Sequence, residues 1–367
     1  MTRLTLLALL VAALLGTLLL ALVLTALALR LAPRLGYVDR PGGHKSHQKP
    51  MPYGGGVAIF LAAWLPIVAA VVLATTVSPG WVAETFGEDV RAYFGGMQTR
   101  VGQMMVILLG ALIIHVLGLI DDLRPLGATF KLIVIVGVSL FVVLIGDLRV
   151  GVMWGPAVSV VLTVAWFVVI INAFNFLDNM DGLSAGVAWL CLAFFTICGL
   201  MAGQVLVPAL ACVFLGAIGG FWVFNFPPAR IFMGDAGSLL IGYMLAVVSV
   251  LTTYYHSGHQ TPPYALAMPL VILAVPLYDF VSVVAIRLAE GRSPLRGDQR
   301  HFSHRLVERG LGRRLAVLTI YLATATTGLA ATLLPGADLR QTITIGILVL
   351  MVLAIVAILE SPLRKEA

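Results

Sequence analysis

The sequence is poor in charged residues: only 11% of its 367 residues are Asp, Glu, Lys or Arg, whereas 60% are hydrophobic. Soluble domains carry about 25% charged residues, so this chain lacks the polar surface that a soluble domain needs. It also has only three cysteines, Cys191, Cys198 and Cys212, with no CxxC pair. This argues against a zinc site or a disulfide framework. The composition is instead typical of a polytopic membrane protein.

Apolar runs of about 20 residues recur along the whole chain, and each is long enough to cross a bilayer. They predict an all-α fold, a polytopic helical bundle that forms one domain over residues 1–367. The first run is longer than a signal-peptide core and has no small-residue cleavage pattern, so we expect it to be retained. A small exposed element is expected at residues 81–96. The eleven predicted spans are residues 4–31, 55–77, 101–120, 128–146, 152–171, 183–202, 206–224, 237–255, 265–289, 314–334 and 342–360.

Basic residues are distributed unequally between the two faces of this predicted bundle. Of the 23 Lys and Arg residues, 18 fall on the face with the C-terminus and 5 on the face with the N-terminus. The positive-inside bias makes the first face cytoplasmic. The net charge of +6 follows from this asymmetry, so we expect membrane lipids as partners and no nucleic acid. The cytoplasmic loops are residues 32–54, 121–127, 172–182, 225–236 and 290–313.

The unusual carboxylates lie on the same predicted face. Asp121 and Asp122 end one span and point about 100° apart on a helix. They can therefore serve different partners, such as a metal and a substrate proton, although a solvated helix end is an alternative. Asp235 stands between two glycines in "MGDAGS", before a predicted helix. Exposed N–H groups there suit phosphate and the carboxylate suits Mg²⁺, with a simple helix cap as the alternative.

The stretch "INAFNFLDNMDG" carries four polar side chains at a spacing of three: Asn172, Asn175, Asp178 and Asp181. This spacing predicts one narrow helix face lined with oxygen ligands. The alternative is a polar turn, where Asn and Asp are common.

Two basic loops are candidates for phosphate binding. The loop "LRGDQRHFSHRLVERG" is either a solvated basic loop or a clamp for a pyrophosphate, formed by Arg300, His301, His304 and Arg305. In "DRPGGHKSHQKPMPYGGG", Lys45, His47 and Lys49 either hold phosphates or anchor a helix to anionic lipid.

Asp279 falls within the ninth predicted span, just after Pro276. Either the helix breaks there and exposes the carboxylate to the site, or the carboxylate is paired inside the bundle. The sequence leaves both open.

In their order along the chain, these loops resemble those of the polyprenyl-phosphate N-acetylhexosamine-1-phosphate transferase family. The family includes the GlcNAc-1-phosphate transferases of wall-polymer and O-antigen synthesis and the phospho-MurNAc-pentapeptide transferase. The resemblance covers nearly the whole chain, from "DRPGGHKSH" to "HFSHR". It implies transfer of a sugar 1-phosphate from a UDP-sugar to polyprenyl phosphate, giving polyprenyl-diphosphate-sugar and UMP. It also implies a bacterial cytoplasmic membrane and an active site on the cytoplasmic side.

The resemblance implies a role for each matching residue. Asp121 would deprotonate or position the lipid phosphate, with Asp122 beside it. Asp235 would bind Mg²⁺, for which Mn²⁺ is a substitute, and Asn175 would be the second ligand. The remaining implied contacts are the nucleotide pocket at Asp178 and Asp181, the phosphate at Lys131, and the diphosphate at His301, His304 and Arg305.

One position departs from the family pattern. Ser303 in "HFSH" stands where GlcNAc-type members commonly have histidine in His-x-His-His. UDP-GlcNAc is the favoured donor, with other UDP-N-acetylhexosamines and the MurNAc-pentapeptide branch as alternatives. A direct displacement and a two-step aspartyl-phosphate route both remain open, as does a homodimer. An ion-coupled transporter would bury polar residues mid-span in matching halves, and no internal repeat is evident.

Overall fold

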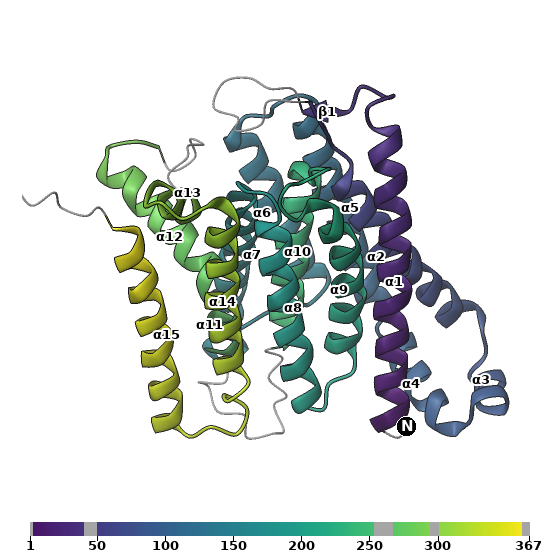
Figure 1. Cartoon of the computed structure of the whole chain (residues 1–367). Coiled ribbons are helices and arrows are strands. Elements are labelled where there is room, and N and C mark those ends of the chain that lie inside the picture. Colours follow the sequence, from purple (N-terminus) through teal and green to yellow (C-terminus); the bar gives the residue numbers. More distant parts are fainter. Residues whose placement is uncertain (1–2, 40–49, 253–266, 294–300, 362–367) are drawn as a thin grey trace, which may run out of the picture.

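The computed structural model describes residues 3–39, 50–252, 267–293 and 301–361, which form a bundle of long helices (Figure 1). Helices satisfy their own backbone hydrogen bonds, which a chain must do inside lipid. The predicted polytopic helical bundle is confirmed. Ten described helices are long and apolar enough to cross a membrane. They are α1 (Arg3–Leu31), α2 (Gly55–Thr76), α5 (Val101–Leu123), α6 (Ala128–Ile145), α7 (Pro156–Leu177), α8 (Leu183–Met201), α9 (Leu206–Asn225), α10 (Gly234–Thr252), α14 (Arg313–Ala331) and α15 (Leu339–Glu360).

The ninth predicted span, residues 265–289, is not one helix. Its described part, from residue 267, contains α11 (Met268–Ile272) and α12 (Ala274–Ala289), which are separated at Leu273. Pro269 is the second residue of α11, and Pro276 lies in the first turn of α12. Proline has no N–H to donate and is tolerated in a first turn, so each proline fits the start of a new helix.

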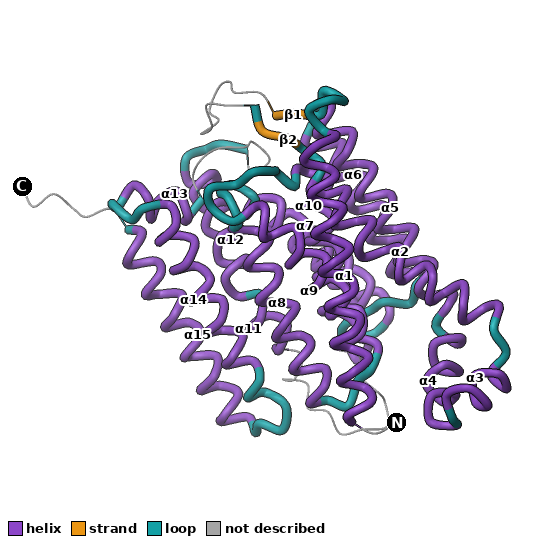
Figure 2. Tube along the Cα trace, turned by 45° about the vertical axis from the view of Figure 1, so that its right-hand side comes forward, coloured by secondary structure: helices purple, strands orange, loops and turns teal. Residues whose placement is uncertain are grey.

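The shorter elements cap the two ends of the bundle. Figure 2 shows the strands β1 (Val38–Asp39) and β2 (Met51–Pro52) at one end, where they pair antiparallel. At the other end, α3 (Pro79–Phe86) and α4 (Glu88–Thr99) stand aside from the long helices and occupy the exposed element predicted at 81–96. The remaining short helices are η1 (Val152–Trp154) and α13 (Phe302–Glu308).

Helix α10 forms the centre of the bundle. It is buried along nearly its whole length and packs against α2, α5, α7 and α8. Gly118 lets α5 approach its first turn, because a Cβ at this position would collide with main-chain atoms of Asp235 and Ala236. Small residues permit this kind of close helix approach in membrane bundles. The end of α5 is therefore held directly beside the start of α10.

Candidate active site

Asp122 fixes the start of α10 from the end of α5. Its Oδ1 accepts the main-chain N–H of Asp235 at 2.7 Å, and its Oδ2 accepts that of Ala236 at 3.2 Å. Tyr37 donates its hydroxyl to the same Oδ2 at 2.9 Å. Burial, followed by the charge of Asp122, raises the pKa of Tyr37 above its usual value, so the hydroxyl remains a donor. Gly234 has φ 67°, and a side chain there would meet the Asp122 carboxylate. Asp122 thus holds the helix N-terminus in place.

Lys131 of α6 bridges two carboxylates. Its Nζ lies 3.0 Å from Asp121 Oδ2 and 2.9 Å from Asp235 Oδ2. The other oxygen of Asp121 accepts the main-chain N–H of Leu126 at 2.7 Å. Adjacent Asp121 and Asp122 therefore serve different partners, as their angular separation on a helix predicts. The site contains a cation held between acidic groups from α5 and α10.

Asn175 brings α7 to the same point. Its Nδ2 donates to Asp235 Oδ1 at 3.1 Å and to Ser238 Oγ at 3.0 Å. One oxygen of Asp235 therefore faces an ammonium and the other an amide. Asp235 is the residue on which α6, α7 and α10 converge.

The predicted row of oxygen ligands does not continue along one helix face. Helix α7 ends one residue before Asp178, whose φ of −80° and ψ of 49° are not helical. Asn172 donates its Nδ2 within its own helix, to the carbonyl of Val168 at 2.8 Å. Asp181 lies in the following loop, where its Oδ2 accepts the N–H of Ala229 at 2.9 Å. Of the four side chains, Asn175 reaches Asp235 by a hydrogen bond.

Asp178 is a partly buried carboxylate near Asp235 that has no hydrogen-bond donor among the described residues. Burial, followed by the charges of Asp235, Asp122 and Asp181, raises the pKa of Asp178 well above its usual value. A carboxyl group in this environment favours a nearby cation or its own protonation.

The loop after α7 is held from two sides by residues that the sequence did not single out. Asn225 of α9 accepts the N–H of Gly182 at 2.9 Å and donates to the carbonyl of Ile231 at 2.9 Å. Tyr321 of α14 donates its hydroxyl to the Gly182 carbonyl. Asn, Tyr and Gly are ordinary residues in these segments, so no local signal marks them.

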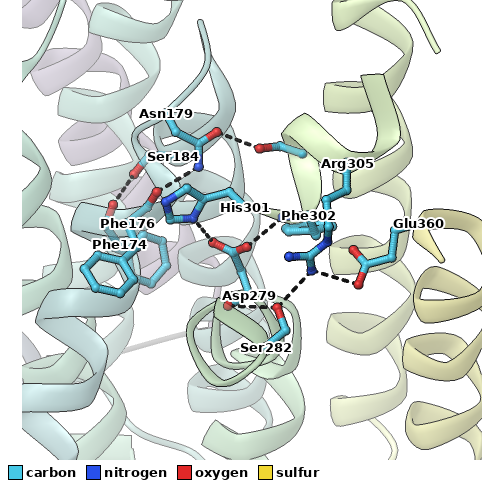
Figure 3. Close-up of polar contacts among 11 residues, drawn as sticks. Phe174, Phe176, Asn179, Ser184, Asp279, Ser282, His301, Phe302, Arg305 and Glu360 are labelled. Atoms are coloured by element: carbon cyan, nitrogen blue, oxygen red, sulfur yellow. Dashed lines mark hydrogen bonds and ion pairs between the residues drawn. The ribbon is translucent and has the colours of Figure 1, made fainter. Parts of the chain in front are cut away.

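The HFSHR element docks on α12 through Asp279. His301 Nδ1 lies 2.9 Å from Asp279 Oδ2, and the main-chain N–H of Phe302 donates to Asp279 Oδ1 at 3.0 Å (Figure 3). Asp279 is fully buried and His301 is 5% exposed. The carboxylate is therefore paired inside the bundle, and the helix break lies six residues before it. The histidine ring stands edge-on to Phe176 of α7, with 5.7 Å between ring centroids.

Other side chains of this element have separate partners. Arg305 Nη2 lies 2.8 Å from Glu360 Oε1 on α15 and donates to Ser282 Oγ at 3.0 Å (Figure 3). Burial, with smaller effects from the nearby His301 and Arg313, lowers the pKa of His304. The predicted phosphate-binding residues Lys45, His47, Lys49 and Arg300 lie outside the described residues.

Ser303, the position that departs from the family pattern, joins the HFSHR element to the loop after α7. Its hydroxyl donates to Asn179 Oδ1 at 2.6 Å, and the side chain is fully buried. Asn179 in turn donates to the carbonyl of Phe176 at 2.7 Å. A short polar side chain therefore fills a position where an imidazole has no space without rearrangement.

The donor atoms of the site fit a magnesium ion. Among the described residues, no three His, Cys, Asp or Glu side chains are grouped as a complete metal cage. Mg²⁺ usually takes one or two protein carboxylates and completes its shell with water and substrate phosphates. Asp235 and Asn175 offer hard oxygen atoms beside Asp178, the carboxylate without a described donor. These residues are suitable for a cation that arrives with a phosphorylated substrate.

The acidic, lysine-bridged site thus lies at one end of a bundle whose helices are long and apolar enough to cross a membrane. Residues 104–253 match glycosyl transferase family 4. The chain is 32% identical over 341 residues to the "Probable undecaprenyl-phosphate N-acetylglucosaminyl 1-phosphate transferase" of Bacillus subtilis (strain 168), with 89% of this chain and 86% of the relative covered. It is 36% identical over 318 residues to the "Decaprenyl-phosphate N-acetylglucosaminephosphotransferase" of Mycobacterium tuberculosis (strain ATCC 25618 / H37Rv), covering 80% and 74%.

A third relative is more distant. The "Undecaprenyl-phosphate alpha-N-acetylglucosaminyl 1-phosphate transferase" of Escherichia coli (strain K12) is 26% identical over 314 residues, covering 81% of this chain and 76% of the relative. The chain belongs to glycosyl transferase family 4. This agrees with the resemblance that the loop motifs indicated.

Proposed function

We propose that this chain transfers N-acetylglucosamine 1-phosphate from UDP-GlcNAc to undecaprenyl phosphate or a similar polyprenyl phosphate. The products are polyprenyl-diphosphate-GlcNAc and UMP. The observation that carries the proposal is the convergence on Asp235 of Lys131 and Asn175, at the end of a membrane bundle of this family. Family members named for this reaction support GlcNAc as the sugar.

The reaction proceeds by direct displacement. An oxygen of the lipid phosphate attacks the sugar-bearing phosphorus of the donor, and the bond from that phosphorus to the UMP oxygen breaks. Asp121 accepts the proton of the lipid phosphate, and Lys131 holds the phosphate oxygens. Holding the two phosphates in line lowers the activation barrier, so the displacement needs no covalent intermediate on the protein.

Asp235 and the amide oxygen of Asn175 would hold Mg²⁺, with Mn²⁺ as a substitute. When bound there, the metal would supply positive charge to neutralise the charge that develops on the leaving UMP. Asp122 keeps the first turn of α10 in place, so that Asp235 does not move when Lys131 turns toward substrate. His301 and His304 contact the diphosphate, and Arg305 supports the element that carries them.

The site faces the cytoplasm from the bacterial inner membrane. The sequence assigns 18 of the 23 basic residues to the loop face that also carries the site residues, and cytoplasmic loops carry such an excess. A water-soluble nucleotide sugar is available on that side. The product is the lipid-linked first sugar of a cell-envelope glycan.

The test is UMP release by the purified protein with undecaprenyl phosphate and Mg²⁺. UDP-GlcNAc, UDP-GalNAc and UDP-MurNAc-pentapeptide are compared side by side, each with and without lipid. We expect release with UDP-GlcNAc only when lipid is present. Release with UDP-MurNAc-pentapeptide alone would place the chain in the other branch. No release with any donor, from folded protein, would contradict the proposal.

A further inference from the structure

Asp279 is a buried carboxylate that the site around Asp235 does not contact. It lies on α12 inside the ninth apolar segment, with 0% of its surface exposed. One oxygen pairs with the His301 ring and the other accepts the main-chain N–H of Phe302 (Figure 3). An acidic group inside a membrane bundle is costly unless it is paired, and such groups are commonly functional.

The two contacts fix the orientation of the His301 ring and determine which of its nitrogens carries hydrogen. An ionised carboxylate only accepts hydrogen bonds, so His301 Nδ1 carries a hydrogen and donates it to Asp279. The ring atom left for another partner is Nε2, to which no described residue forms a hydrogen bond. The edge-on contact with Phe176, at an interplanar angle of 76°, restrains rotation of the ring.

Phe176 links this histidine to the carboxylate site. It directly follows Asn175 in α7, and its ring packs on two side chains of α12. The guanidinium of Arg287 lies 4.9 Å from the ring centroid, and the ring of Phe280 lies at 5.5 Å. Helix α12 therefore holds His301 and the end of α7 in one fixed relation.

We propose that Asp279 is a positioning residue of the transfer reaction, which holds His301 so that Nε2 faces the diphosphate of the sugar nucleotide. The inference rests on the proposed function. A carboxylate on one ring nitrogen sets the tautomer and the direction of the other nitrogen. When Nε2 is protonated, it donates to a phosphoryl oxygen, and Asp279 balances the charge of the ring.

The Asp279→Asn variant tests whether Asp279 orients His301 or only stabilises the fold. The amide is isosteric, and its oxygen still accepts the N–H of Phe302. Its NH₂ group then faces Nδ1, which must become an acceptor, so the ring can no longer carry hydrogen on both nitrogens and loses the positive charge that Asp279 balances. We expect kcat/KM for UDP-GlcNAc to fall about 10- to 100-fold, the usual cost of losing a residue that orients another. The matched control is Asp338→Asn, because Asn caps the exposed start of α15 equally well.

A double-mutant cycle shows whether Asp279 acts through His301. Asp279→Asn, His301→Ala and the double variant are compared by kcat and KM at saturating lipid. We expect the double variant to be no worse than His301→Ala, because the positioned group is already absent. Multiplicative losses would mean that Asp279 only supports the fold, and unchanged activity in Asp279→Asn would also overturn the inference.

A spectroscopic measurement on the wild-type protein tests the same contact without any activity. The chain has 7 histidines, and ¹⁵N labelling of histidine reports which ring nitrogen of each carries hydrogen. We expect His301 of the wild-type protein, identified by loss of its signal in His301→Gln, to carry it on Nδ1. Hydrogen on Nε2 alone would overturn the inference. If wild-type protein releases no UMP, the proposed function fails, whereas this reading still decides the contact between Asp279 and His301.

Discussion

Asp235 holds together groups that are far apart in the sequence. Its carboxylate contacts Lys131 and Asn175, and its main-chain N–H is bound by Asp122. These partners lie 104, 60 and 113 positions away along the chain. A change at Asp235 therefore alters the charge of the site without removing any helix from the core.

Asp235→Asn should lower kcat by about 10²- to 10³-fold, because a preorganised charged group at a phosphoryl-transfer site contributes on this order. The amide keeps the size of the side chain but no longer neutralises Lys131 or a bound cation. UMP release at saturating substrates measures the effect. Asp338→Asn on the opposite end of the bundle is the control. Near-normal turnover in a folded Asp235→Asn protein would show that Asp235 has no catalytic role.

Ser303 gives a second prediction, on stability. Ser303→Ala should cost about 1 kcal/mol, because Asn179 loses the hydrogen bond that the serine donates. Ser303→His should cost about 1–3 kcal/mol, because a larger ring must enter a fully buried position. Thermal unfolding followed by tryptophan fluorescence compares the two variants. A histidine variant as stable as wild type would show that the surroundings of Ser303 adapt readily.

The sequence allowed the carboxylates to be predicted because charged groups at the ends of apolar helices need a partner. It did not point to Tyr37, Asn225 or Tyr321. Each of these is ordinary in its own segment and acquires its role through a contact 85, 43 or 139 positions away. Pairing of Asp279 inside the bundle was one of two alternatives, with no partner named, because the partner depends on how α12 packs.

The sequence predicts which segments form membrane-spanning helices, but it does not predict the residues at which those helices end. Hydropathy reports a run of apolar residues, and ten such runs are helices of suitable length. It does not report where backbone hydrogen bonds stop. A helix break near Pro276 and a polar turn after α7 were open alternatives in the sequence, but the structure alone places the break at Leu273 and the end of α7 before Asp178. Both breaks affect the site. The break at Leu273 starts α12, which carries Asp279 to His301, and the end of α7 places Asp178 in a loop.

Gly118→Ala tests the close approach of α5 and α10. The added methyl group would meet main-chain atoms at the start of α10, so the helices must separate and Asp122 must shift from the N-terminus it holds. We expect a loss of about 1–3 kcal/mol in stability, with a fall in kcat. Gly137→Ala in α6 is the matched control, because nothing lies within 4 Å of a Cβ there. Equal behaviour of the two variants would contradict a constrained contact at Gly118.

For the molecule as a whole, the charge asymmetry predicts which end faces the cytoplasm. A cysteine introduced at Glu308 on α13 and one at Arg340 on α15 lie on opposite ends of α14, and both positions are exposed. A membrane-impermeant maleimide added to intact cells should label Arg340→Cys, and Glu308→Cys only after permeabilisation. The three native cysteines are free and buried, so they should react little. The reverse pattern would contradict the proposed orientation.

The overall reaction is tested most directly by following the sugar-linked phosphate. Purified protein is supplied with undecaprenyl phosphate, Mg²⁺ and UDP-GlcNAc labelled with ³²P in the phosphate next to the sugar, and both products are quantified. The proposed transfer predicts one UMP released for each labelled phosphate that enters the lipid fraction. Label released into water as GlcNAc phosphate, or UMP formed without any lipid, would show hydrolysis rather than transfer and would contradict the assigned reaction.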